Sequence, residues 1–301
     1  PTLIEIGRVA DISNEVFGPV LHIRRYARSE LDGVIDAVNA TGYGLAFGIQ
    51  SRLSSTIDRA VARSTAGNIY VNRGLLGAVA GSRPVGGHGL SGTGPKMGGP
   101  FALRRMSAQV NPWHVPKGAT TASMIPHAAR SLVTFLESRD AVSARRIRQD
   151  ISHGMVGLTM TLPAPSGETE TYSLVPGGPV LCAGDSWPAI LRAVGMALGT
   201  GNVALVLGPD HAVEWMSRLS AGLKDWVQRV DPGALPECST MLMEADSPLA
   251  QQAASTLTAR EGRIVPIHTL DSVRPEWLMK ERLVSINTAA VAGDLRLMAV
   301  S

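Results

Sequence analysis

The feature that most constrains this chain is a run of nine glycines within residues 77–99, in the segment GAVAGSRPVGGHGLSGTGPKMGG. Glycine loses roughly 0.5–1 kcal/mol of extra backbone entropy when it is held in a regular element. We therefore predict a shaped loop here, in which the backbone turns sharply or approaches a ligand closely. Loops of this kind on a rigid scaffold are common places for binding and catalysis.

Length and composition predict a soluble globular protein. At 301 residues the chain is long enough for about two domains. Apolar runs such as residues 179–183 are far shorter than the ~18 residues that a membrane span needs. The net charge is only +3, and we interpret the basic cluster at residues 145–148 as the solvated face of a helix. We expect no membrane span and no nucleic-acid partner.

The cysteines and histidines give no sign of a metal site. Cys182 and Cys238 are too few and too far apart for a disulfide scaffold, which favours a reducing, cytoplasmic setting. We interpret both as buried structural thiols. No cysteine–histidine grouping has zinc-ligand spacing. His88 lies alone in the glycine-rich loop and is interpreted as a surface or packing residue rather than an acid–base group.

The first 72 residues alternate between strand and helix patterns. Because alternation requires crossover connections, it predicts a parallel sheet covered by helices. The glycine-rich loop directly follows the third strand, and ligands in open α/β sheets lie beyond the carboxyl ends of strands. The loop is therefore expected where a substrate would bind. Strands are predicted at residues 19–26, 45–50 and 68–72, with helices from Leu31 to Gly42 and from Leu53 to Gly67.

The second half of the chain has an αβα pattern on the scale of one half of a dinucleotide-binding fold. Its first buried strand is followed by Gly184-Asp185-Ser186-Trp187, which lacks GxGxxG and places acidic and bulky residues where a phosphate would approach. We expect this region to keep the fold without binding a nucleotide. Residues 112–122 are predicted to be a linker, 152–161 stay ambiguous, helices are expected at 128–150, 187–200 and 211–230, and strands at 179–185 and 203–207.

Four motifs, in order and spacing, resemble the last third of an aldehyde dehydrogenase catalytic domain. The full glycine-rich segment, together with ERLVSINTAAVAGDLRLM at residues 281–298, is more specifically similar to the proline utilization A family. Its bacterial members join a proline dehydrogenase to an L-glutamate-γ-semialdehyde dehydrogenase. The four motifs are EVFGPV (15–20), YGLAFGI (43–49), GNIYVNR (67–73) and PVGGHGLSGTG (84–94).

The resemblance implies an α/β fold with two domains. Residues 1–111 would be the C-terminal portion of an aldehyde dehydrogenase catalytic domain, with a parallel sheet, helices, the substrate loop and an assembly flap at 100–110. Residues 112–301 would form a Rossmann-like αβα structural domain, with residues 295–300 as a closing strand near the glycine-rich loop.

The resemblance also assigns binding roles to five residues. Glu15 matches the glutamate that binds the nicotinamide ribose hydroxyls of NAD, a task that suits an acceptor-only carboxylate, and Phe17 matches the aromatic beside that ribose. Gly77 and Ala78 match positions whose N–H groups hold the substrate α-carboxylate, where small residues let amides converge on an anion. Val85 stands where the family usually has phenylalanine. From the residues alone, Glu15 could be an exposed turn carboxylate, and Gly77–Ala78 a plain turn.

The family reaction needs a cysteine thiolate, hydride transfer to NAD and hydrolysis aided by a carboxylate base. By family order the cysteine nucleophile and the carboxylate base lie upstream of Glu15. We therefore expect no catalytic residue in this chain and no activity of this piece alone. The start at Pro1, without methionine, also indicates a piece of a longer polypeptide.

The resemblance therefore implies the C-terminal portion of a proline-catabolic enzyme that oxidises L-glutamate-γ-semialdehyde to glutamate with NAD. It implies FAD in an absent upstream domain, and as partners the upstream part of the same chain and further copies in a homo-oligomer. Two alternatives stay open. One is an aldehyde dehydrogenase with another substrate, favoured by Val85, and the other is a non-catalytic dehydrogenase-like scaffold.

Overall fold

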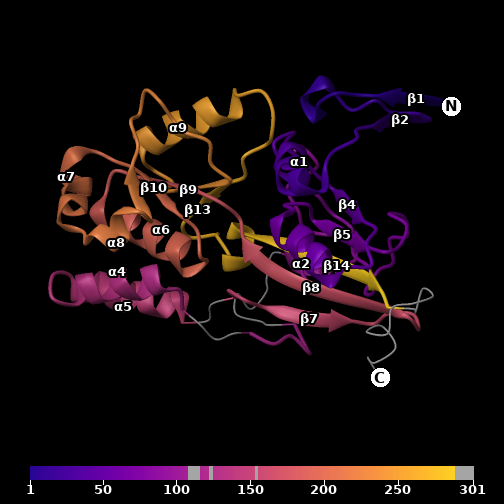
Figure 1. The fold of residues 1–301 in the computed structure, drawn as a ribbon. Helices are drawn as coiled ribbons and strands as arrows, with labels where there is room; N and C mark the ends of the chain where they lie inside the picture. The colour runs from indigo at the N-terminus through magenta and orange to yellow at the C-terminus, as the bar shows by residue number, and fades with distance from the viewer. Residues whose placement is uncertain (108–115, 122–124, 153–154, 289–301) are drawn as a thin grey trace. The chain divides into compact units, whose positions relative to one another are not determined.

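The computed structural model describes residues 1–107, 116–121, 125–152 and 155–288 and separates into two compact units (Figure 1). Unit 1 consists of residues 1–99, 162–171 and 282–301, and unit 2 of residues 100–161 and 172–281. Each unit is thus assembled from segments far apart in the sequence. The expected domain boundary between residues 111 and 112 lies outside the described residues.

Unit 1 begins with a two-stranded parallel sheet of β1 (Thr2–Glu5) and β2 (Val20–Ile23). The predicted strand at residues 19–26 is confirmed, but the expectation that it joins the two following strands in one sheet is wrong. It pairs with β1 instead. The Thr2 N–H donates to the Pro19 carbonyl at 2.9 Å, and the Ile6 N–H donates to the Ile23 carbonyl at 2.8 Å.

The next two predicted strands and the two helices of unit 1 are confirmed. The α1 helix (Leu31–Asn39) and the α2 helix (Ser54–Arg63) are joined by ion pairs such as that of Asp32 with Arg59. The strands β4 (Ala46–Ile49) and β5 (Asn68–Val71) pair in parallel.

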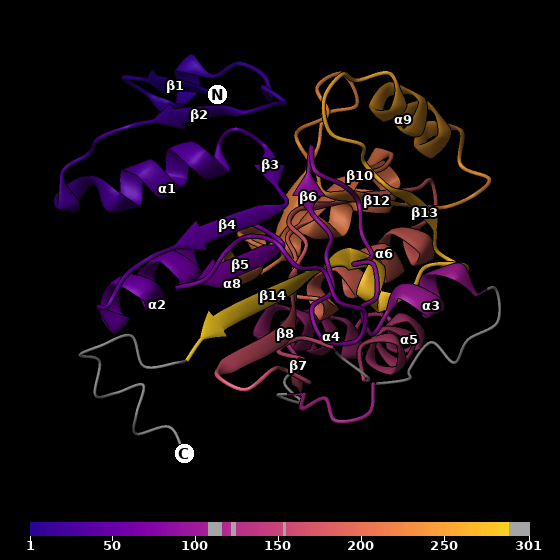
Figure 2. The same ribbon diagram turned by 90° about the vertical axis from the view of Figure 1, so that its right-hand side faces the viewer.

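The fully buried β5 pairs on its other side with β14 (Met279–Asn287), again in parallel. Figure 2 shows the resulting five-stranded order β4-β5-β14-β8-β7, with β8 at Glu168–Pro176 and β7 at Thr159–Leu162. We did not predict β8 and β14 as strands.

The glycine-rich segment is a loop, as predicted, and is fastened to an earlier turn of unit 1. Its two-residue strand β6 (His88–Gly89) pairs antiparallel with β3 (Tyr43–Gly44). The Gly44 N–H also donates to the hydroxyl of Ser91 at 3.0 Å. The short α3 helix (Ala102–Met106) follows in unit 2, and residues 108–110 of the expected flap lie outside the described residues.

Unit 2 contains a five-stranded parallel sheet with the order β11-β10-β9-β12-β13. In chain order this is 3-2-1-4-5, the arrangement of the dinucleotide-binding fold. The sheet is larger than the half-fold that the sequence predicts. Its strands are β9 (Val180–Ala183), β10 (Ala204–Leu207), β11 (Val227–Arg229), β12 (Thr240–Met243) and β13 (Ile267–Thr269).

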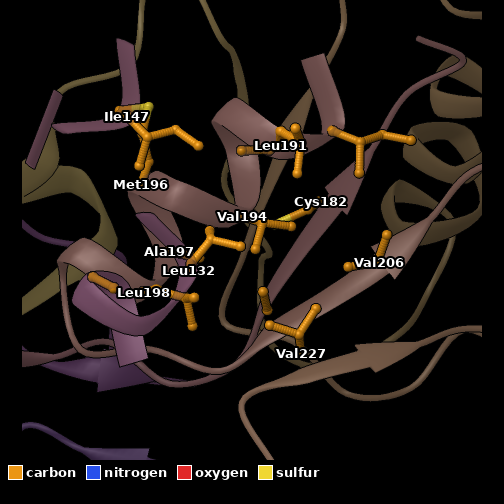
Figure 3. Packing of buried hydrophobic residues seen from close by; sticks show 14 of the residues in the cluster. Leu132, Ile147, Cys182, Leu191, Val194, Met196, Ala197, Leu198, Val206 and Val227 are labelled. Carbon is orange, nitrogen blue, oxygen red and sulfur yellow. The ribbon is translucent and has the colours of Figure 1, made fainter. Parts of the chain in front are cut away.

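Helices cover both faces of this sheet because successive strand residues point to opposite sides. Val180 and Cys182 of β9 belong to a buried cluster shared with α4, α5 and α6 (Figure 3), and Leu181 and Ala183 to a second cluster shared with α9. The covering helices are α4 (His127–Glu137), α5 (Ala141–Ile151), α6 (Trp187–Gly199) and α9 (Pro248–Thr258).

Two helices predicted in unit 2 are corrected by the structure. The helix expected at 128–150 is two helices, α4 and α5. Asp140 lies between them and starts the second one as its N-cap, where its side chain accepts the Ser143 N–H at 3.0 Å. The helix expected at 211–230 is interrupted, since Leu219 and Ser220 adopt extended backbone. In its place are α7 (Asp210–Val213), a 3₁₀ turn (Glu214–Arg218), α8 (Ala221–Lys224) and β11.

Two further expectations fall partly or wholly on residues that the structure does not describe. The predicted closing strand at residues 295–300 lies outside the described residues, as do residues 112–115 and 122 of the predicted linker. Residues 159–162, at the end of the ambiguous stretch, form β7. Among the described residues, no helix combines the length and apolar character needed to cross a membrane.

Candidate functional site

The five residues assigned by resemblance lie in two separate loops of unit 1. Glu15 and Phe17 belong to the loop before β2, where both side chains are exposed and Phe17 is 96% accessible. No described residue donates a hydrogen bond to the Glu15 carboxylate. Gly77, Ala78 and Val85 lie together in the loop after β5. Glu15 and Phe17 lie in a different loop.

The start of the glycine-rich loop is a tight hairpin between Val79 and Arg83. The Val79 N–H donates to the Arg83 carbonyl at 3.0 Å, and the Arg83 N–H donates to the Val79 carbonyl at 2.7 Å. At the tip, the N–H of Gly81 donates to the carbonyl of Gly98 at 2.9 Å. This part of the loop therefore has a defined backbone shape.

The Gly77–Ala78 peptide precedes this hairpin and is exposed. Gly77 has φ +109°, which L side chains rarely adopt, and an added Cβ would lie 3.0 Å from Nη1 of Arg83. The same Nη1 donates to the Gly77 carbonyl at 3.1 Å. Among the described residues, none accepts a hydrogen bond from the Ala78 N–H.

A buried cluster of charges supports the hairpin from strands far along the chain. Arg83 donates from Nε to Glu170 at 2.7 Å and also pairs with Glu168, while Arg73 donates to Glu168 at 2.8 Å. Ser285 of β14 accepts from Arg73 at 2.8 Å and donates to Glu170 at 2.9 Å. The sequence offered no sign of this cluster, because the acidic residues come about 90 positions later and only β-sheet pairing brings them close.

A second buried charge holds the middle of the loop on β5. The Lys96 ammonium donates to the Asn68 side-chain oxygen at 2.6 Å and to the Gly86 carbonyl at 2.7 Å. Asn68 in turn donates to the Pro84 carbonyl at 2.9 Å. Val85 is partly buried and forms an antiparallel bridge with Met97. Val85 is thus placed in a loop whose two sides are fastened together.

In unit 2 the place where a dinucleotide fold binds phosphate is already filled by a side chain. The Glu244 carboxylate, at the end of β12, accepts the N–H groups of Asp185 and Ser186 at 2.8 and 3.0 Å and the Ser186 hydroxyl at 2.7 Å. Burial opposes ionisation of Glu244, but these hydrogen bonds outweigh it and hold its pKa below the usual value. The N-terminus of α6 therefore already has an anion.

Both cysteines have the structural character that the sequence predicts. Cys182 and Cys238 are free and buried, and burial raises the pKa of each thiol. A thiol in such surroundings is a poor nucleophile, since the thiolate is the reactive form. Among the described residues, no group of three or more histidine, cysteine, aspartate or glutamate side chains could hold a metal ion.

Comparison with known proteins gives the class of the segment that holds both loops. Residues 8–110, which include both loops, match the model described as "Aldehyde dehydrogenase family". This segment belongs to that family, and the resemblance read from the sequence motifs is confirmed.

Individual relatives of known name narrow the comparison further than the family match does. The whole chain is 36% identical to "Bifunctional protein PutA" of Rhizobium meliloti and covers 25% of it. A third of the chain is 40% identical to "1-pyrroline-5-carboxylate dehydrogenase" of Bacillus subtilis, covering 19% of that protein. The structure of Proline Utilization A from Corynebacterium freiburgense matches 91% of this chain and 26% of its own, with a TM-score of 0.62 at 21% identity, which supports the fold. The chain spans about a quarter of the length of its full-coverage curated relatives.

Proposed function

We propose that this chain is the C-terminal portion of a proline-catabolic enzyme that oxidises L-glutamate-γ-semialdehyde to glutamate with NAD. Residues 1–111 would complete an aldehyde dehydrogenase catalytic domain, and residues 112–301 would be a structural domain. The observation that carries the proposal is the exposed Gly77–Ala78 peptide, held by Arg83 with its Ala78 N–H available, in a segment of the aldehyde dehydrogenase family.

The substrate side of the proposal depends on the charge of the semialdehyde. This substrate carries an α-carboxylate, and exposed backbone N–H groups on a small-residue turn suit such an anion. Gly77 and Ala78 would bind the carboxylate, and Val85 would contact the aliphatic part of the molecule. The absence of side-chain bulk at Gly77 and Ala78 leaves room for the ligand to approach the backbone.

The cofactor side of the proposal depends on Glu15 and Phe17. The Glu15 carboxylate is exposed and has no donor among the described residues, so it fits two ribose hydroxyl donors. Phe17 is almost fully exposed and offers a flat apolar surface beside that ribose. When bound, NAD would supply the hydride acceptor, and these two residues would orient its nicotinamide ribose.

The catalytic cysteine and the general base would come from an upstream part of the same polypeptide, because both thiols here are buried. The relatives' length, about four times that of this chain, supports such a part. FAD in an upstream domain and a homo-oligomer are further proposals, which rest on the resemblance of the sequence motifs to the proline utilization A family. The free cysteines agree with a cytoplasmic setting.

The experiment that tests this function is a steady-state assay of the full-length protein with NAD and L-glutamate-γ-semialdehyde, with glutamate measured as the product. We expect a higher kcat/KM for the semialdehyde than for pentanal, which has the same chain length and no carboxylate or amine. Equal efficiencies would instead favour the second candidate, an aldehyde dehydrogenase for simpler aldehydes. The observation behind that candidate is Val85, which fills less volume than the family phenylalanine.

A further inference from the structure

We propose that Arg83 is a positioning residue of the substrate loop. Held by Glu168 and Glu170, it fixes the Gly77–Ala78 peptide so that the Ala78 N–H faces outward, toward a carboxylate on the substrate. The inference rests on the proposed function, because it takes this peptide as the element that binds the anion.

The geometry of a single peptide unit carries the argument. The Gly77 carbonyl and the Ala78 N–H belong to one trans peptide, in which the two groups point in opposite directions. Nη1 of Arg83 donates to that carbonyl at 3.1 Å. The Ala78 N–H must therefore point away from Arg83, and Ala78 is exposed. A rotation of this peptide would break the bond to Arg83.

The guanidinium is itself held firmly, which makes it a rigid support. Its Nε donates to Glu170 at 2.7 Å, its Nη2 pairs with Glu168, and its backbone is bridged to Val79. The Arg83 side chain is 7% exposed and that of Glu170 is fully buried. Each nitrogen thus has a different acceptor in a fork geometry that only arginine supplies.

Because the cluster pairs two guanidinium groups with two carboxylates, Arg83 has no unpaired charge to offer a ligand. Recognition of the anion is then left to the backbone N–H, and Arg83 acts only by setting its direction. Loss of this orientation should weaken binding of aldehydes that carry a carboxylate and leave aldehydes that lack one unaffected.

Arg73 provides a matched control within the same cluster. It shares both carboxylates, donating to Glu168 at 2.8 Å and to Glu170 at 3.4 Å, and it also contacts Ser285. It donates no hydrogen bond to Gly77. A variant of Arg73 therefore disturbs the cluster without removing the bond that orients the peptide.

The test compares Arg83→Gln, Arg83→Lys and Arg73→Gln in the full-length protein, with kcat and KM measured for L-glutamate-γ-semialdehyde, pentanal and NAD. Arg83→Gln should raise KM for the semialdehyde about ten-fold, since a hydrogen bond to a charged ligand becomes misdirected. KM for pentanal and NAD should change less than about two-fold by the same reasoning. Arg83→Lys should fall between wild type and Arg83→Gln, and Arg73→Gln should leave the ratio of the two aldehyde KM values near that of wild type.

The outcomes separate this inference from the proposed function. If the wild-type protein does not prefer the semialdehyde, the proposed function is contradicted. If it does and Arg83→Gln affects both aldehydes equally, or Arg73→Gln changes their ratio as much, the positioning role is overturned. Should Arg83→Gln fail to fold, Glu168→Gln, at a partly exposed carboxylate, must move the KM ratio in the same direction by a smaller factor, and an unchanged ratio would overturn the role.

Discussion

Glu244 and Ser186 are joined by two hydrogen bonds, one from the Ser186 N–H at 3.0 Å and one from its hydroxyl at 2.7 Å. Ser186 caps α6 at the end of β9, and Glu244 follows the neighbouring β12. In a sheet of this order, the crevice between these strands is where dinucleotides bind. A built-in carboxylate repels a pyrophosphate and already uses its donors, which supports a structural role for unit 2.

Replacing Glu244 should loosen the start of α6. We expect Glu244→Gln to weaken local stability by about 1–3 kcal/mol at neutral pH, because the neutral amide keeps only one acceptor oxygen for the three donors that the charged carboxylate now accepts. Amide hydrogen exchange over residues 185–190 should become correspondingly faster. Asp246→Asn, two residues away and exposed, is the control and should leave exchange unchanged. Equal exchange in Glu244→Gln and wild type would contradict this assignment.

The same carboxylate predicts a pH dependence. Since the pKa of Glu244 is lower in the folded state than in the unfolded chain, its contribution to stability is full above the unfolded pKa. The contribution is lost as pH falls through the folded pKa. The difference in exchange between wild type and Glu244→Gln should therefore be largest near pH 7 and should shrink below about pH 4.5. A difference that stays constant across this range would exclude a charged Glu244.

His268 should produce a second pH effect with a different window. Burial, together with the Arg105 charge, lowers the pKa of His268 to about 4, and its ring lies 4.7 Å from that of Trp277. Because the unfolded chain binds the proton first, stability should fall as pH drops from about 6.5 toward 4. The loss is at most about 3 kcal/mol, reduced because the ring is partly exposed.

His268→Phe tests this, with thermal unfolding of the full-length protein measured between pH 7 and pH 4.5. The variant should lose less stability across that range than wild type does. His211→Phe, at an exposed histidine, serves as the control. Parallel pH curves for wild type and His268→Phe would rule out the effect.

Lys96 should be important for the stability of the glycine-rich loop. Its side chain is 1% exposed and bonds to Asn68 and Gly86, so Lys96→Met leaves two buried acceptors with fewer donors. We expect a loss of roughly 2–4 kcal/mol in the free energy of unfolding. Arg59→Met removes an exposed ion pair with Asp32 instead and should lower the unfolding temperature much less than Lys96→Met does. Comparable shifts in the unfolding temperature of the two variants would contradict a structural role for Lys96.

Glu15 tests the cofactor assignment independently of the substrate loop. In the full-length protein, Glu15→Gln should raise KM for NAD by about ten-fold, because an uncharged acceptor binds ribose hydroxyls less strongly. KM for the aldehyde should stay near the wild-type value. Asp58→Asn, an exposed carboxylate of α2, is the matched control. An unchanged KM for NAD would favour the reading in which this segment is a non-catalytic scaffold.

Local patterns predicted the elements whose partners are near in sequence. Helix α1 followed from apolar spacing after Leu31, and β5 from an apolar run between Gly67 and the glycine-rich loop. The failures arise where tertiary pairing decides. The helix expected at 211–230 does not reach its predicted end because Val227 pairs with Ala204 in the sheet, and ladder formation overrides an apolar spacing that also suits a helix.

In the candidate site, too, residues within one contiguous motif could be predicted, and residues brought together by sheet pairing could not. Resemblance could single out Gly77, Ala78 and Val85 because the loop motif is contiguous. The support for that loop could not be predicted, since Glu168 and Glu170 lie in β8 and only pairing of β8 and β14 beside β5 brings them to Arg83. The contact of Glu244 with Ser186 could not be predicted either, because β12 is adjacent to β9 in space but about 60 residues away in sequence.

Binding of the substrate carboxylate by the Ala78 N–H is best tested by a crystal structure of the full-length protein with glutamate, the proposed product, bound. We expect its α-carboxylate within hydrogen-bonding distance, about 2.7–3.2 Å, of the backbone nitrogen of Ala78, with Arg83 still bonded to the Gly77 carbonyl. A glutamate bound with its carboxylate on other groups, while the Ala78 N–H stays without a ligand, would contradict it.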